Sequence, residues 1–233
     1  MLDGREAARR FPMISLSGNP VLYQPDSGIV HAERALEAFR DGARAAGAII
    51  REQATVTHLD LSGADAVIRL EGETIRARVA VITAGAWAKD LLGQIGYELD
   101  VRPTRETVAY FDMEGLVPPT LVEWGDPAAY SLLDPRTGGL KAGEHVAGPT
   151  TDPNEEGIVH EGSVERIAAW VGERFPHAKP VPIHSETCIY TNTPDEHFVL
   201  DRRGPFVVGS PCSGHGFKFA PLIGQRLATL AAR

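Results

Sequence analysis

Three reactive side chains stand close together near the end of the sequence, in the segment CSGHGFKF. Cys212, His215 and Lys218 supply a thiol, an imidazole and an ammonium group, and Gly214 and Gly216 lie between them. Glycine has no Cβ, so a ligand can approach the backbone here. The start of a following helix would favour a negatively charged group. The alternative is a glycine-rich turn with a solvated lysine, and the pattern alone leaves both interpretations open.

Two further segments place chemical groups on one face of a predicted strand. In ETCIYTNTPDEHFVLD, Cys188 and Tyr190 are two residues apart and point the same way, because strand side chains alternate. They could line a pocket, or be a small buried hydrophobe and a core-edge residue. In GGLKAGEH, Lys141 and His145 are also an even number of residues apart. A lysine in a cleft can stabilise developing negative charge; the alternative is a solvated lysine on a strand edge.

The elements that must position these groups begin with α/β patterns. Residues 31–48 space apolar side chains as one helical face, and Gly47 is placed to end that helix. A strand and a hairpin around the letters EGE follow. Residues 79–83 form an apolar, β-branched run that predicts a strand covered on both faces. The glycine turn after it, at Gly85 and Ala86, is where doubly wound folds admit a nucleotide.

From residue 100 the pattern changes to short strand-like pieces separated by proline and glycine, which predicts a broad antiparallel sheet. Residues 162–175 predict one amphipathic helix within that region. Strands return at 185–203 and 205–211, and the segment that starts at His215 closes the chain as a helix. No internal repeat or low-complexity tract interrupts this order.

Composition excludes several classes of function. The net charge of −8 argues against a nucleic-acid partner, which selects a positive surface. No apolar run approaches the ~20 residues that span a membrane. The two cysteines provide no disulfide framework, which fits a reducing cytoplasm. Neither CxxC nor HExxH is present, so no dedicated metal site is expected, and no GxGxxG or GxxxxGK[ST] phosphate loop is found.

Taken together, these segments resemble one family. The strongest matches are CIYTNTPDEHFVLD and SGHGFKFAPLIGQ, with KAGEH, VITAGAW and GIVHAERALEAF in the expected order. The sequence resembles, nearly end to end, the monomeric sarcosine oxidase and N-methyltryptophan oxidase group of FAD-dependent amine oxidoreductases in the D-amino-acid oxidase superfamily. The resemblance implies an α/β (α+β two-domain) fold. In it, a Rossmann-like FAD-binding domain, incomplete at its N-terminus, is interleaved with an antiparallel-sheet substrate domain. The expected substrate-domain parts are 1–30 and 100–187, and the FAD-binding parts are 31–99 and 188–233.

The resemblance also implies which residues hold FAD. Cys188 matches the cysteine that forms a thioether with the flavin, and Cys212 is the less expected attachment point. Val56 matches a position on the adenine side of the cofactor. Gly85 and Ala86 approach FAD from one turn. The turn that contains Gly214 and Gly216, with Lys218, approaches it from another.

For the substrate, the resemblance places Tyr190, His215 and Lys218 around the bound amine, with Lys218 facing a carboxylate as a point charge. Lys141 matches the lysine that promotes reaction of the reduced flavin with O₂, and His145 matches a histidine near the amine. The implied activity is oxidation of secondary amines, of the sarcosine or N-methyl amino acid type, to an imine with O₂ reduced to H₂O₂. A small-molecule amine and O₂ are the expected partners, and no nucleic acid or membrane is expected.

Two alternatives stay open. One is a relative of glycine or D-amino-acid oxidases; the other is a non-catalytic C-terminal fragment, or half of a split flavoprotein that needs an N-terminal segment or a second chain. The family opens with a strand–GxGxxG–helix unit of ~30 residues that binds the pyrophosphate, and this sequence lacks it, together with the family's carboxylate-binding arginine. We therefore expect exposed strand edges in the parallel sheet. We also expect weak or no FAD binding by this chain alone.

Overall fold

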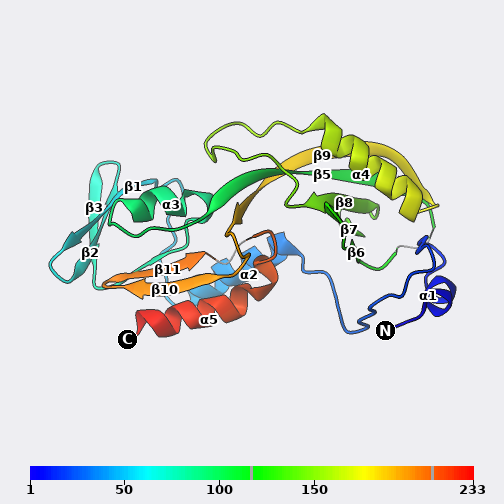
Figure 1. The fold of residues 1–233 in the computed structure, drawn as a ribbon. Helices are drawn as coiled ribbons and strands as arrows, with labels where there is room; N and C mark the ends of the chain where they lie inside the picture. The colour runs from blue at the N-terminus through cyan, green and yellow to red at the C-terminus, as the bar shows by residue number, and fades with distance from the viewer. Residues whose placement is uncertain (116–117, 211–212) are drawn as a thin grey trace. The chain divides into compact units, whose positions relative to one another are not determined.

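The computed structural model describes residues 1–115, 118–210 and 213–233. The chain divides into two compact units, each made of segments far apart in sequence (Figure 1). The first unit comprises Met1–Val30, Arg105–Pro149 and Asn154–Cys188, and the second comprises His31–Thr104, Thr150–Pro153 and Ile189–Arg233. Within the described ranges, no helix has both the length and the apolar character that crossing a membrane requires.

The first unit is built on a five-stranded sheet with the strand order β6-β7-β8-β5-β9. Its strands are β5 (Arg102–Met113), β6 (Leu121–Glu123), β7 (Ala128–Leu133), β8 (Leu140–His145) and β9 (Ala178–Asn192). The pairs β6–β7, β7–β8 and β8–β5 are antiparallel, which confirms the sheet predicted from the proline- and glycine-punctuated sequence.

Helix α4 (Glu161–Arg174) covers one face of this sheet. Its Ile167 and Val171 pack with strand residues such as Phe111 and Ala142, all at most 2% exposed. Because strand side chains alternate, the intervening residues of β5 and β8 point to the opposite face. A short helix, α1 (Gly4–Arg10), also belongs to this unit, and Asp3 caps it by accepting from the N–H groups of its first turn.

The second unit contains two three-stranded sheets. In the first, β1 (Val56–Ser62), β2 (Asp65–Leu70) and β3 (Glu73–Ala77) pair in sequence order, and the β2–β3 hairpin confirms the one predicted around EGE. In the second, β11 (Phe206–Ser210) lies between β10 (Val199–Arg203) and β4 (Ala80–Ile82). It pairs with β10 antiparallel and with β4 parallel.

Strand β11, and not the 79–83 segment, is the strand of this unit buried on both faces. All five of its residues are buried. On one face Val207 packs against α5 (Ala220–Ala231), and on the other Val208 packs beside α3 (Ala88–Gly93). The pattern of residues 79–83 is typical of a strand covered on both faces, but β4 is only three residues long and lies at the edge of its sheet, so Val81 remains 44% exposed.

Helix α2 (Ala32–Ala45) confirms the helix predicted before Gly47, which adopts a left-handed φ of +87° directly after it. Its apolar side is nevertheless uncovered in the part of the chain that the structure describes. No residue of α2 is buried, and Leu36 and Phe39 are 57% and 44% exposed. Amphipathic helices are normally stabilised by packing this face, so α2 presents a surface that further polypeptide could cover.

Candidate active site

The sheet face of the first unit that points away from α4 carries the polar groups predicted on β8. Tyr110 of β5 lies directly opposite Lys141 in the strand register, and Val108 lies opposite Gly143. Since alternate residues share a face, Lys141, Gly143 and His145 all belong to this side. The even spacing of Lys141 and His145 therefore does place them on one strand face.

Tyr110 is the centre of a charged cluster on this face. Its side chain is buried, and its hydroxyl donates to the Glu186 carboxylate. Lys141 Nζ lies 5.4 Å and Arg136 Cζ 5.0 Å from the centroid of the Tyr110 ring, distances at which a cation is attracted to an aromatic face. Burial first, and then the hydrogen bond to Glu186, raise the pKa of Tyr110 strongly. The hydroxyl therefore stays protonated and acts as a donor.

Glu186 is held in its charged form by the same contacts. The hydrogen bond from Tyr110 is the largest cause that lowers the pKa of Glu186, and the charges of Lys141 and Arg136 act in the same direction against a penalty from burial. Arg136 also bonds Asp134, whose side chain is almost fully buried. The result is a cluster of alternating charges around one aromatic ring.

Cys188 lies two residues after Glu186 in β9 and shares its side of the strand. The residue reaches the surface, yet the protein around the sulfur is dense enough that desolvation raises the pKa of the thiol. The positive charge of Lys141 opposes this rise, whereas Glu106 and Glu186 reinforce it. The charge of Lys141 on β8 thus acts on the Cys188 thiol on β9, although the sequence alone gave no link between these two strands.

In the second unit, the glycine-rich turn after β11 is packed against Tyr190. Gly214 has a φ of +73°, and a Cβ at this position would lie 2.1 Å from Tyr190 Cε2. Only glycine therefore fits. Ser213 fixes the turn to the end of β9, because its N–H donates to Thr191 O at 2.8 Å and its Oγ accepts from the N–H of Thr193 at 3.2 Å.

His215 and Lys218 also lie in this turn. The His215 ring lies against the Phe198 ring at a tilt of 36°, with a centroid separation of 5.3 Å. Lys218 is exposed, and its Nζ donates to His215 O at 2.9 Å. An ammonium group has three donors, so this contact does not exhaust them. Gly216 is buried and immediately precedes the short helix η2 (Phe217–Phe219), whereas Cys212 lies outside the described residues.

The other two predicted cofactor contacts differ in their surroundings. Gly85, with a φ of +53°, directly follows the β4 region and has no atom within 4 Å of the place where a Cβ would stand. Ala86 is buried in the short helix η1 (Gly85–Trp87). Val56 opens β1, and its partly buried side chain packs against the cluster of Leu59 and Phe206.

These second-unit turns fit a bound dinucleotide. β4 and β11 are parallel neighbours, so their carboxyl ends lie at one sheet edge, which is where ligands bind in open α/β sheets. Both strands lead into glycine turns with left-handed backbone. Ser210 ends β11 and is 3% exposed, yet its Oγ has no hydrogen-bond partner in the described part of the chain. A buried unpaired hydroxyl costs about 1–3 kcal/mol, which a polar ligand atom would recover.

Sequence reasoning missed three residues of the first-unit face. Tyr110 and Tyr130 become visible only through strand register, since both lie opposite residues of β8. A Cβ on Gly143 would lie 2.9 Å from the Tyr130 hydroxyl oxygen, so that ring lies across the strand. Glu186 did have a signal, its even spacing from Cys188. Within the described ranges, no group of three or more histidine, cysteine or acidic residues could hold a metal ion.

Comparison with known proteins agrees with the family resemblance found in the sequence. The model of the family described as "DAO: FAD dependent oxidoreductase" matches residues 1–230. Human "Peroxisomal sarcosine oxidase" is 32% identical over 100% of this chain and 64% of its own length. "Monomeric sarcosine oxidase" of Bacillus sp. strain B-0618 is 29% identical over 99% of this chain and 63% of its own length. The chain thus spans somewhat less than two thirds of these relatives.

Solved structures agree over the whole chain. NikD, titled an unusual amino acid oxidase essential for nikkomycin biosynthesis, superposes with a TM-score of 0.82 at 25% identity, over 100% of this chain and 64% of that one. Glycine oxidase from Geobacillus kaustophilus gives a TM-score of 0.83 at 25% identity, over 100% of this chain and 62% of that one. The mixed α/β fold, the glycine turns at the β4–β11 edge and the family match lead to one conclusion: the chain belongs to the DAO family of FAD-dependent oxidoreductases.

Proposed function

We propose that this chain belongs to an FAD-dependent oxidase that acts on secondary amines of the sarcosine or N-methyl amino acid type. The observation that carries this proposal is the placement of Lys141 and Cys188 on the same face of one sheet, with Tyr110 of the intervening strand contacting Lys141 and Glu186. The similarity to sarcosine oxidases at about 30% identity supports the substrate class.

The residues that would hold FAD are those predicted from the sequence. Cys188 would attach the flavin through a thioether. The backbone at Gly85, Ala86, Gly214 and Gly216 would approach the cofactor, with Val56 on its adenine side. When bound, FAD accepts the hydride equivalent from the carbon next to the amine nitrogen and passes the electrons to O₂, which yields an imine and H₂O₂.

The chain's own charged groups have distinct roles in this proposal. Lys141 supplies a fixed positive charge where negative charge develops on O₂. Lys218 offers a point charge to a substrate carboxylate. Tyr190 and His215 line the substrate beside Lys218, and His145 lies near the amine. The amine must lose its proton before oxidation, so activity should rise with pH.

Two observations each favour an alternative to this proposal. The match to glycine oxidase at a TM-score of 0.83 keeps a primary amino acid as a second candidate substrate. Among the described residues, β4 lies at a sheet edge and one side of α2 is uncovered, which favours a half-protein whose cofactor site is completed by additional polypeptide. In that case the chain alone binds FAD weakly, because the phosphate-binding glycine loop is not within it.

A reducing compartment such as the cytoplasm fits the two cysteines.

The deciding experiment is a visible absorption spectrum of the purified chain before and after acid precipitation. Yellow colour retained in the precipitate means covalent flavin, and Cys188→Ala should release it, whereas Cys212→Ala should not. A protein that is colourless, and that is still colourless after incubation with FAD and removal of the unbound cofactor, supports the half-protein alternative. Oxygen consumption with sarcosine against glycine then separates the two substrate classes in any flavin-bearing form.

A further inference from the structure

The turn that follows β8 has a strained backbone at a residue type that rarely adopts this conformation. Val146 has a φ of +55°, in the left-handed region. Among the described non-glycine residues with positive φ, it alone is β-branched, and branched side chains are disfavoured there. Such strain persists only where the surroundings fix it, and it concentrates at functional sites. Val146 directly follows His145.

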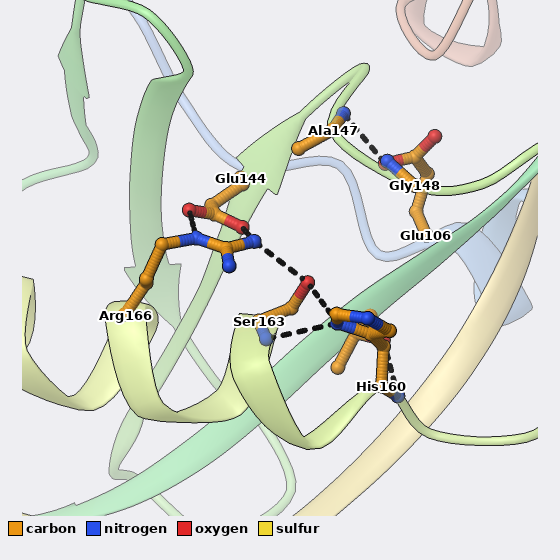
Figure 2. A network of polar contacts seen from close by, with 8 residues as sticks. Glu106, Glu144, Ala147, Gly148, His160, Ser163 and Arg166 are labelled. Carbon is orange, nitrogen blue, oxygen red and sulfur yellow. Dashed lines mark hydrogen bonds and ion pairs between the residues drawn. The ribbon is translucent and has the colours of Figure 1, made fainter.

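A buried carboxylate holds this turn. Glu106 is 1% exposed, and its Oε2 accepts the N–H groups of Ala147 at 3.1 Å and Gly148 at 2.9 Å (Figure 2). Hydrogen bonds from backbone N–H groups to an ionised carboxylate are strong. The turn also packs tightly on β5, because a Cβ on Gly148 would lie 2.1 Å from Arg105 O.

The residue on the other side of His145 is anchored as well. Glu144 accepts from Arg166 Nε and Nη2, both at 2.8 Å, and Arg166 donates further to Ser163 Oγ at 3.1 Å (Figure 2). These contacts tie the end of β8 to α4 on one face of the sheet. His145 thus lies between a neighbour fixed to α4 and a turn fixed to β5.

We propose that Glu106 is a positioning residue for His145. Its carboxylate holds the strained turn 146–148, and the turn in its strained form sets the direction of the His145 imidazole on the face that carries Lys141. The value of that positioning rests on the proposed function, in which His145 lies near the amine. The positioning itself is a property of the first unit and is measurable without cofactor or substrate.

The test is a cycle of two substitutions in the full chain, Glu106→Gln and Val146→Gly. Glu106→Gln removes the charge but keeps the shape, and we expect the unfolding equilibrium constant to rise about tenfold. Val146→Gly relieves the strain, because glycine adopts this φ freely. In the Val146→Gly background the effect of Glu106→Gln should fall below about threefold, since the turn no longer depends on the carboxylate.

The second measurement is the Cε1–H NMR resonance of His145, assigned among the eight histidines by its loss in His145→Gln. We expect this resonance to shift or broaden in Glu106→Gln and to return in the double variant. A purely structural role would lower stability without moving it. An unchanged resonance, or an equal stability loss in both backgrounds, overturns the proposal.

Two further outcomes are informative. If Glu106→Gln does not fold, rescue of folding by Val146→Gly supports the proposal, and failure of the double variant to fold counts against it. If the cycle behaves as expected but a flavin-bearing form oxidises no amine, the positioning role stands and the proposed function fails.

Discussion

The Gly214→Ala substitution tests whether the glycine turn and Tyr190 form one packed unit. The new methyl group meets two penalties. A left-handed backbone costs a non-glycine residue about 1–2 kcal/mol. Overlap with the rigid Tyr190 ring, 2.1 Å from the ideal Cβ position, adds about 1–3 kcal/mol as an overpacked contact. We expect the free energy of unfolding to fall by about 2–5 kcal/mol, measured by urea denaturation followed through tryptophan fluorescence.

Gly204→Ala is the matched control, because Gly204 has a φ of +59° but no atom within 4 Å of its Cβ position. It should cost only the backbone part, about 1–2 kcal/mol. In a Tyr190→Ala background the excess cost of Gly214→Ala over Gly204→Ala should disappear, since the overlapping ring is gone. Equal losses for the two glycine substitutions in the native background would refute this reasoning.

Three further predictions follow from the charged groups. In a Cys212→Ser background, iodoacetamide should label Cys188 at neutral pH more slowly in Lys141→Met and faster in Glu186→Gln. The reason is that Lys141 lowers and Glu186 raises the pKa of the Cys188 thiol. The opposite order of labelling rates contradicts the placement of these two charges near the thiol. The Arg174 guanidinium, at 2.7 Å, is the main cause of the lowered pKa of Glu123. Glu123→Gln should therefore cost about 1 kcal/mol at pH 7, a modest value because the carboxylate is partly exposed. Because the pKa of Glu123 is lower in the folded state, the ionised carboxylate contributes stability above the unfolded pKa of about 4.3, and this contribution is lost as the pH falls through the folded-state pKa. The stabilities of the native protein and the Glu123→Gln variant should therefore converge in acid. A stability difference that persists there contradicts the reasoning. For a flavin-bearing form, amine oxidation should rise from neutral to alkaline pH, and a flat profile counts against a bound amine that loses its proton.

Local patterns in the sequence predicted much of the fold. The α2 helix and the β2–β3 hairpin each depend on periodicity and turn residues within one short segment, and both are present where expected. The short α1 helix was missed, although Asp3 at its start, Glu6 in its first turn and Arg9 and Arg10 in its last turn are signals for it. Residues 79–83 were predicted as a fully covered strand from composition alone. Composition does not say which strand is central, and β11 has that place instead.

The candidate site was harder to predict because it depends on strand register. Spacing within one strand placed Lys141 with His145 and Cys188 with Tyr190. The neighbourhood of Tyr110, Lys141 and Glu186 arises only when β5, β8 and β9 are aligned side by side. The strained turn at Val146 left no trace in composition or periodicity, since valine is the residue least expected there.

In the described part of the chain, the side of α2 that carries Leu36 and Phe39 is uncovered and β4 lies at a sheet edge, and both have a practical consequence for handling the protein. Exposed apolar side chains and unpaired strand N–H and C=O groups drive self-association and attract chaperones. The yield of dispersed protein should therefore depend on concentration and on temperature during expression, whatever the stability of each unit. Light scattering across a dilution series would show this, and a charged residue at Phe39 should reduce the scattering without altering the second unit's core. These two features of the second unit thus bear on whether the chain stays dispersed long enough for its chemistry to be measured.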